Sequence, residues 1–229
     1  MSKKLMIVSG DSFTASDYQS IHYPKINCDW AGWPELVADE LDMECINLAR
    51  SGSGNEYIYS SLLDEVNKHK IEDIGFVFAG WTQAGRMDWT IKDYWKSDHV
   101  ISSFLQNTMP GGDEQHQIKK TLRYQYSFQQ VMKSLALPFA HIQMVRLVRE
   151  TPNSIPQHLR NMPIANHNFK FEKTFIDYTR HYKWGAESEI VPNTPNDKYR
   201  IGKDDGHFNG EGHKLFAEYI LKKFENWEK

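Results

Sequence analysis

Short apolar runs alternate with amphipathic stretches along the first two thirds of the chain. Four runs, at 5–8, 44–48, 74–79 and 138–145, are short and bounded by polar or turn residues, which is typical of buried strands. The segments after the first three carry apolar residues at helical spacing and predict helices at 34–43, from 55 to 66 and at 118–135. This alternation predicts parallel strands joined by right-handed crossovers.

The remaining stretches are less regular. The segment 212–227 predicts a final amphipathic helix, and 14–33 reads as a loop because it has little periodicity and contains Pro24. The segment 85–117 is rich in aromatic residues. We interpret it as an inserted lid or wall, helical in parts, that either covers a substrate cleft or forms a surface segment held by a few buried rings. The segment 151–197 is irregular around a short helix expected near 169–182.

Length, composition and net charge limit the number of domains, the class of partner and the cellular compartment that the chain can be expected to have. The 229 residues, 40% of them hydrophobic, predict a single domain spanning 1–229. The net charge of -3 argues against nucleic acid or an anionic membrane as a partner and favours a neutral or weakly polar small molecule. The chain lacks a signal-like or membrane-spanning apolar segment, which predicts a cytoplasmic protein, and nothing in the composition predicts its oligomeric state. The two cysteines, Cys28 and Cys45, are expected to be reduced, although a single bridge between them stays open.

The candidate chemistry lies at the two ends of the chain. Ser12 follows the first strand within Gly10-Asp11-Ser12, at the strand end where open α/β sheets hold their ligands. Near the other end, Asp204 and Asp205 precede His207. A serine needs a histidine to take its proton and a carboxylate to hold that histidine. The residues alone also allow ordinary roles, with Asp-Ser as a turn or helix cap and the histidine as a solvated loop residue.

Together these pieces resemble the SGNH hydrolases, also called GDSL-type esterases and lipases. The first motif of that family, a strand followed by Gly-Asp-Ser, matches Gly10-Asp11-Ser12, and its Asp-x-x-His motif matches Asp204 and His207. The segment 47–53 is similar to the motif whose glycine donates a backbone N–H to the oxyanion, with Gly52 in that position. The Gly-x-Asn-Asp motif is the departure, because Thr82 stands where the family has its asparagine.

The resemblance implies a serine esterase that forms an acyl-enzyme and uses neither a metal nor a cofactor. Its substrate would be a small ester, such as an acetyl group on a carbohydrate. In this interpretation Ser12 is the nucleophile, His207 the base and Asp204 the acid, although Asp205 competes and only the family's spacing favours Asp204. Gly52 and Ser12 would donate backbone N–H groups to the oxyanion.

The third oxyanion donor is open between Thr82, Gln83 and Asn55. The resemblance also implies the fold, a three-layer α/β/α sandwich around a parallel sheet of about five strands in flavodoxin-like order.

Two alternatives remain at this stage. The first is a weak or inactive SGNH-like domain used for glycan binding or assembly, which the threonine at position 82 motivates. The second is a metal-dependent hydrolase that uses four residues of the C-terminal motif, namely Asp204, Asp205, His207 and His213. His213 is otherwise expected to be an ordinary first-turn residue of the last helix, and Asn209 its cap.

Overall fold

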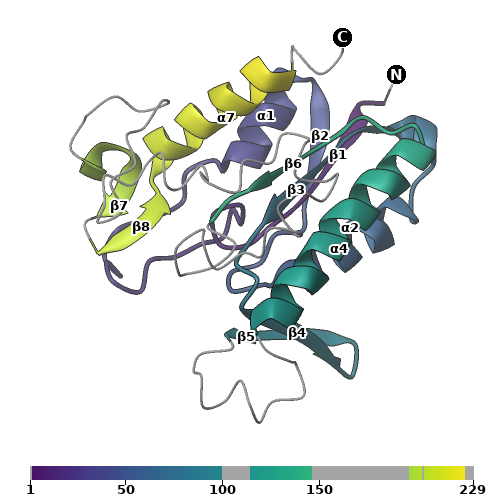
Figure 1. Ribbon diagram of the computed structural model, residues 1–229. Coiled ribbons are helices and arrows are strands. Elements are labelled where there is room, and N and C mark those ends of the chain that lie inside the picture. The colour runs from purple at the N-terminus through teal and green to yellow at the C-terminus, as the bar shows by residue number, and fades with distance from the viewer. Residues whose placement is uncertain (1, 100–113, 146–195, 203, 225–229) are drawn as a thin grey trace.

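A parallel sheet forms the centre of the protein. The computed structural model describes residues 2–99, 114–145, 196–202 and 204–224 (Figure 1). Four strands pair in the order β2-β1-β3-β6, and each pairing is parallel. They are β1 (Lys4–Ser9), β2 (Met43–Asn47), β3 (Ile74–Trp81) and β6 (Phe139–Gln143). This order is the flavodoxin-like one that the sequence predicts, and the described residues supply four of the roughly five expected strands.

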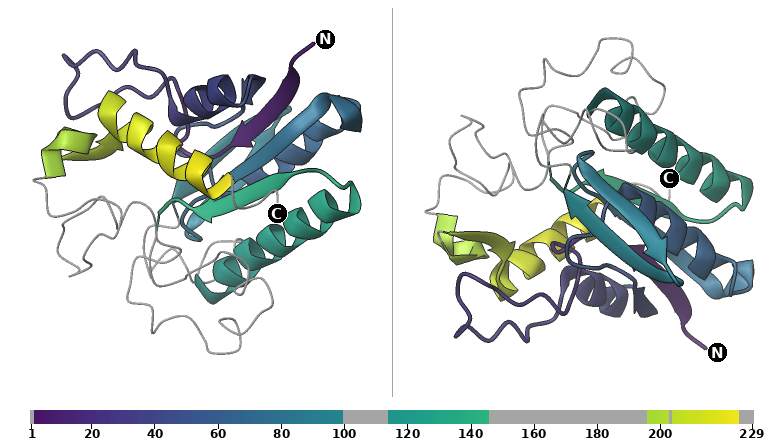
Figure 2. Two further views of the ribbon diagram at one scale, coloured as in Figure 1. Left: turned by 90° about the horizontal axis from the view of Figure 1, so that it is seen from above. Right: turned by 90° about the horizontal axis from the view of Figure 1, so that it is seen from below.

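Helices cover both faces of the sheet (Figures 1 and 2). Helices α1 (Trp33–Glu40) and α7 (Gly210–Phe224) lie on one face, and α2 (Asn55–Val66) and α4 (Glu114–Ser134) lie on the other. Short 3-10 turns η1 (Ile71–Asp73) and η4 (Asn196–Tyr199) precede β3 and β7. The three-layer α/β/α architecture is therefore confirmed.

The structure corrects the end of one predicted helix and defines part of the segment 85–117. The first helix ends at Glu40 rather than near 43, because Asp42 takes a positive φ of 52° and turns the chain into β2. The segment 85–117, expected to be helical in parts, starts with an antiparallel hairpin, β4 (Arg86–Ile91) with β5 (Tyr94–His99), and its last described residues belong to the first turn of α4. Polar and apolar side chains alternate at a period of two along β4, which suits a strand. The helix expected at 169–182 lies outside the described residues.

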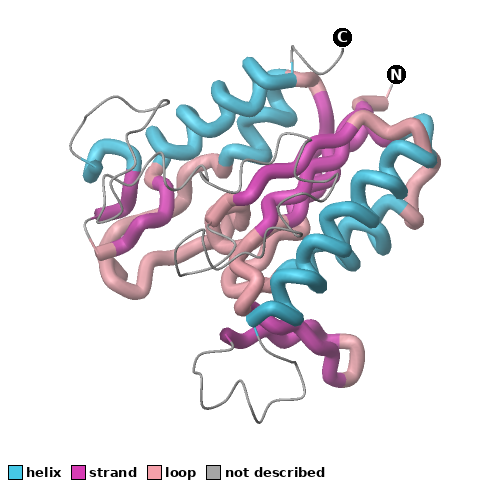
Figure 3. Tube along the Cα trace, in the orientation of Figure 1, coloured by secondary structure: helices cyan, strands magenta, loops and turns pink. Residues whose placement is uncertain are grey.

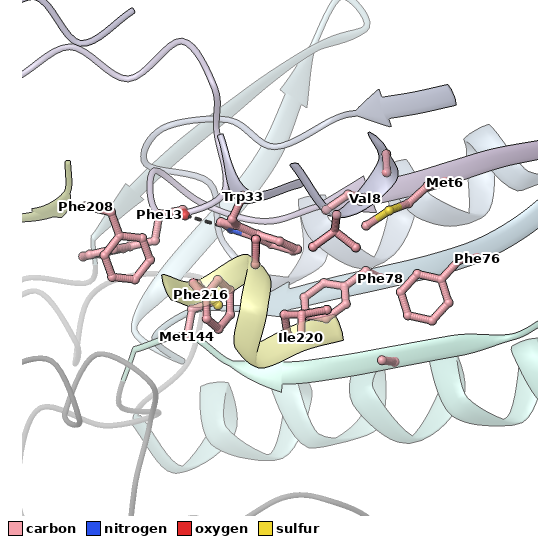
Figure 4. Close-up of a cluster of buried hydrophobic side chains, with 14 of the residues drawn as sticks. Met6, Val8, Phe13, Trp33, Phe76, Phe78, Met144, Phe208, Phe216 and Ile220 are labelled. Carbon is pink, nitrogen blue, oxygen red and sulfur yellow. Dashed lines mark hydrogen bonds between the residues drawn. The ribbon is translucent and has the colours of Figure 1, made fainter. Parts of the chain in front are cut away.

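Trp33 anchors the core layer between the sheet and helices α1 and α7 (Figure 4). Its ring is fully buried between Phe78 and Phe216, and burial of such a side chain contributes on the order of 2 kcal/mol. Its indole Nε1 donates a hydrogen bond of 3.1 Å to the Phe13 carbonyl. The core therefore holds the residue directly after Ser12 in place.

A second hairpin, β7 (Arg200–Gly202) with β8 (Asp205–Phe208), carries the C-terminal motif. The long loop between β1 and α1, drawn in pink, runs out to this hairpin (Figure 3). Asn209 ends the hairpin and caps α7, since its Oδ1 accepts a 3.0 Å hydrogen bond from the Gly212 N–H. This confirms the expected cap.

Both cysteines are free thiols in the structure, with Cys28 buried and Cys45 half-buried. Burial raises the pKa of the Cys45 thiol to about 12, so this thiol stays protonated at neutral pH. Among the described residues, no helix combines the length and the apolar character needed to cross a membrane.

Candidate active site

Ser12 lies in a tight turn at the carboxyl end of β1. The Asp11 carbonyl accepts hydrogen bonds from the N–H groups of Thr14 (2.9 Å) and Ala15 (3.0 Å), and Asp11 Oδ1 accepts one from Phe13 N–H at 3.1 Å. Gly10 must be glycine here, because a Cβ at this position would lie 2.3 Å from Thr14 Oγ1. The turn brings Ser12 to the sheet edge that the sequence predicts, with its side chain largely buried.

Ser12, His207 and Asp205 form a continuous hydrogen-bonded chain. Ser12 Oγ lies 2.7 Å from His207 Nε2, and His207 Nδ1 lies 2.6 Å from Asp205 Oδ1. The serine and the histidine are 195 positions apart in the sequence, and hairpin β7–β8 brings them together. This arrangement lets a hydroxyl proton move to the imidazole while a carboxylate holds the other ring nitrogen.

The expectation that Asp204 holds the histidine is wrong. Its side chain is exposed, and its Oδ2 lies 3.5 Å from the Tyr23 hydroxyl instead. The reason is the strand geometry of β8, in which residues two apart point to the same face. The side chains of Asp205 and His207 therefore lie on the same face of β8 and can bond to each other, whereas Asp204 lies before the strand begins.

Asp205 is held as a carboxylate by several donors. The hydroxyls of Tyr18 and Ser20 donate to its Oδ2 at 2.9 and 2.5 Å, and the His207 backbone N–H donates to its Oδ1 at 3.0 Å. Burial alone raises the pKa of this carboxyl group, but the hydrogen bonds from Ser20 and His207 outweigh it and lower the pKa to about 2. Asp205 is therefore ionised throughout the neutral range.

The loop that carries Gly52 is bonded directly to the nucleophile turn. Ser53 Oγ and the Arg50 N–H both donate to the Gly10 carbonyl, at 2.9 and 3.1 Å. Gly52 has a φ of 81°, which a residue with a side chain rarely adopts. Within the described part of the chain, the N–H groups of Ser12 and Gly52 donate no hydrogen bond to the protein. Their role as oxyanion donors stays a prediction.

Thr82 and Asn55, two of the three candidates for the third oxyanion donor, use their side-chain donors elsewhere. Thr82 Oγ1 donates to Asp11 Oδ2 at 2.7 Å. Asn55 Nδ2 donates to the Thr82 carbonyl at 3.0 Å and to Thr121 Oγ1 at 3.1 Å, and its Oδ1 accepts from Thr82 N–H at 2.8 Å. Both side chains thus brace the end of β3. The half-buried Gln83 contributes only its carbonyl to this network, which accepts from Asn55 Nδ2 at 3.3 Å.

Arg86 is a site residue that sequence reasoning missed. Its Nη1 donates to Asp11 Oδ2 and to the Ser53 carbonyl, each at 3.0 Å. The side chains of the pair are 11% and 0% exposed, so the guanidinium neutralises a buried carboxylate. It also ties the nucleophile turn to the Gly52 loop. One arginine inside an aromatic-rich segment gives no local signal for this contact.

Removing the Arg86 cation is expected to destabilise the fold. The Arg86→Met variant leaves Asp11 buried without its counter-charge, and the expected loss of unfolding free energy in denaturant titrations is about 3 kcal/mol. The matched control is Lys3→Met, which breaks the exposed Lys3–Asp42 pair and should leave the denaturation midpoint unchanged. Equal midpoints for the wild type and the Arg86 variant would refute the assigned role.

His213 does not join the other C-terminal residues in a metal site. It is buried in the first turn of α7, and its Nδ1 accepts a 3.2 Å hydrogen bond from the Trp33 N–H. Burial lowers the pKa of His213 to about 4, so the ring is neutral above that range. Asp204 faces Tyr23, and across the described residues no group of three or more candidate ligands is arranged to hold a metal ion.

A small pocket opens beside the hydrogen-bonded chain. Ser12 and His207 line it together with residues of the loop after β1, among them Tyr18, Cys28 and Trp30. The irregular segment 14–33 thus contributes to the lining of this pocket.

Comparison with known proteins bears on the fold. Neither a protein-family model nor a curated protein sequence matches this chain. Among solved structures, the acetyl xylan esterase from the rumen bacterium Butyrivibrio proteoclasticus is similar with a TM-score of 0.50 at 12% identity. The match covers 99% of this chain and 64% of that protein, so this chain spans less than two thirds of its length. The fold is that of the SGNH hydrolases.

Two further esterase structures match over nearly their full length. The psychrotrophic esterase EstA from a Pseudoalteromonas species has a TM-score of 0.49 at 13% identity, with 98% of each chain covered. The acetyl xylan esterase AlAXEase has a TM-score of 0.49 at 15% identity, with 96% of this chain and 98% of that chain covered. At these identities and TM-scores the two likenesses carry no argument about the activity, which is argued from the site.

Proposed function

We propose that this chain is a serine ester hydrolase in which Ser12 is the nucleophile, His207 the general base and Asp205 the acid that orients the base. The observation that carries the proposal is the unbroken chain from Ser12 Oγ to His207 Nε2 (2.7 Å) and from His207 Nδ1 to Asp205 Oδ1 (2.6 Å). A serine hydroxyl is a poor nucleophile at neutral pH, and this geometry supplies the base that activates it.

The reaction follows from the positions of these three residues. Ser12 Oγ bonds to the ester carbonyl carbon while its proton passes to His207 Nε2. The tetrahedral intermediate then expels the alcohol, which leaves with that proton, and an acyl group remains on Ser12. Water attacks the acyl carbon, again losing a proton to His207, and the carboxylic acid product and free Ser12 are formed. Asp205 stays ionised and stabilises the imidazolium at both steps.

The oxyanion formed in these steps would be met by the backbone N–H groups of Ser12 and Gly52. Thr82 donates its only hydroxyl proton to Asp11, so this site has no side-chain donor in the position of the family's asparagine. One such donor is worth about 10² to 10³ in kcat. We therefore expect turnover well below that of an SGNH esterase with three donors.

The proposed substrate is a small ester, with an acetyl group on a carbohydrate as the leading candidate. The net charge of -3 gives no attraction for a strongly anionic substrate. The pocket beside Ser12 is bordered by small side chains at Ala15 and Cys28, which suits a short acyl group. Two of the solved structures with a similar fold are acetyl xylan esterases.

Hydrolysis of p-nitrophenyl esters tests the proposal. The wild type should turn over the acetate ester and discriminate against the octanoate ester by about tenfold or more, in line with the small pocket. A chelator should leave the rate unchanged. Loss of activity in the chelator would contradict the serine mechanism and favour a metal-dependent one.

A second candidate function is a binding module on the same scaffold, favoured by the Thr82–Asp11 hydrogen bond that removes a donor from the oxyanion hole. It predicts a folded wild type with no ester turnover that still binds acetylated xylo-oligosaccharide in calorimetry. Turnover that depends on Ser12 would exclude it as the sole function.

A further inference from the structure

The imidazole of His207 lies between two aromatic rings. The Phe13 ring stacks on it with centroids 4.3 Å apart and planes 19° apart, and the Tyr18 ring stacks on it at 3.8 Å and 22°. Both aromatic residues belong to the turn and loop that follow β1. The loop after Ser12 thus contacts the base as well as the pocket.

Tyr18 has a second contact that Phe13 lacks. Its hydroxyl donates a 2.9 Å hydrogen bond to Asp205 Oδ2, the oxygen that also accepts from Ser20 Oγ at 2.5 Å. Ser20 Oγ in turn accepts a 3.0 Å hydrogen bond from the Tyr23 N–H, which fixes this part of the loop. Tyr18 therefore contacts the base through its ring and the acid through its hydroxyl.

We propose that Tyr18 is a positioning residue of the active site, which aligns Asp205 through its hydroxyl and stabilises the His207 imidazolium through its stacked ring. The inference rests on the proposed function, because the imidazolium forms when Ser12 gives up its proton. A cation over the face of an aromatic ring is stabilised by the electrons of that ring. The stack thus favours the charged form of the histidine relative to the neutral form.

The titratable groups that face His207 are few within the described residues. Asp205 is ionised in the neutral range, and the neutral His213 is the titratable group that α7 brings near. Burial and the hydrogen bond to Asp205 raise the pKa of Tyr18, so its hydroxyl stays protonated and continues to donate. Asp11 is paired with Arg86 beneath the nucleophile turn. Between pH 5 and 8, the acid limb of a rate profile should therefore report His207.

Two variants separate the ring from the hydroxyl. Tyr18→Phe keeps the stack and removes the hydrogen bond to Asp205, and we expect kcat to fall about threefold to tenfold. Tyr18→Leu removes both contacts, and we expect a fall of about 30-fold or more. KM for p-nitrophenyl acetate should change less than kcat in both variants, since the loss arises where the imidazolium forms.

The pH profile distinguishes this role from a purely structural one. Without the stacked ring the imidazolium is less stable, so the acid limb of kcat/KM for Tyr18→Leu should lie at lower pH than that for Tyr18→Phe. The matched control is Tyr23→Phe, which alters the same loop but loses only the contact of the Tyr23 hydroxyl with the exposed Asp204. Its kcat and profile should match those of the wild type.

NMR titration of the His207 ring tests the inference without turnover. The expected result is a His207 midpoint at lower pH in Tyr18→Leu than in Tyr18→Phe, with thermal unfolding used to verify that both variants fold. Coincident midpoints would overturn the inference whether or not the protein hydrolyses esters. An inactive wild type in which the two midpoints still differ would overturn only the proposed function.

Discussion

Replacing Ser12 with alanine is expected to lower kcat for p-nitrophenyl acetate by about 10⁶-fold, to the background rate. Ser12 Oγ is the hydroxyl hydrogen-bonded to His207, and no other group in that chain can form the acyl-enzyme. The loss should appear in kcat, because alanine removes the reacting atom and leaves the pocket nearly intact.

The control for this variant is Ser9→Ala. Ser9 is the last residue of β1, and its Oγ lies 2.8 Å from Ser61 Oγ in α2, outside the hydrogen-bonded chain of the candidate site. Ser9→Ala should retain turnover within about threefold of the wild type, a difference of less than 1 kcal/mol in activation free energy. A folded Ser12→Ala protein with wild-type kcat would refute the assignment of the nucleophile.

The second large effect concerns the two neighbouring aspartates. Asp205→Asn is expected to lower kcat by about 10⁴-fold, because an amide at this position can hold the imidazole in the wrong tautomer and does not stabilise its cation. Asp204→Asn should stay within about twofold of the wild type, since that side chain is exposed and contacts only Tyr23. Steady-state kinetics of the two isosteric variants gives the comparison.

These two variants test which aspartate holds His207. The structure assigns Asp205, whereas the spacing of the family's Asp-x-x-His motif assigns Asp204. Both substitutions remove one carboxylate and alter neighbouring positions, so each controls for the effect of the other on charge and folding. A large loss in Asp204→Asn with a nearly unaffected Asp205→Asn would restore the interpretation based on sequence and contradict the hydrogen bond to His207.

The sequence predicts the parts of the site that depend on strand ends. Ser12 is predicted because it follows an apolar strand, and the carboxyl ends of parallel strands meet at one edge of a sheet. Gly52 is predicted from the resemblance of the segment 47–53 to a motif of the SGNH family. The alternation of strands and helices predicts the parallel sheet, and the family resemblance implies the order of its strands. His207 was found because it lies beside acidic residues just before the final helix.

The remaining parts depend on packing between distant segments. The choice of Asp205 over Asp204 follows from the strand conformation of β8, which is only four residues long and carries no alternating apolar pattern of its own. The Thr82 hydroxyl bonds to Asp11 across 71 positions, and Tyr18 reaches Asp205 across 187. Such contacts leave no spacing or periodicity in the sequence from which they could be inferred.

The most direct test of the central claim is covalent trapping with a p-nitrophenyl phosphonate, followed by peptide mass spectrometry. A phosphonate reacts with a serine only when that serine is activated as a nucleophile. The account predicts a single adduct on the peptide that contains Ser12 in the wild type, greatly slowed labelling in His207→Ala and none in Ser12→Ala. A folded wild type that stays unlabelled, or carries the adduct on another residue, would contradict it.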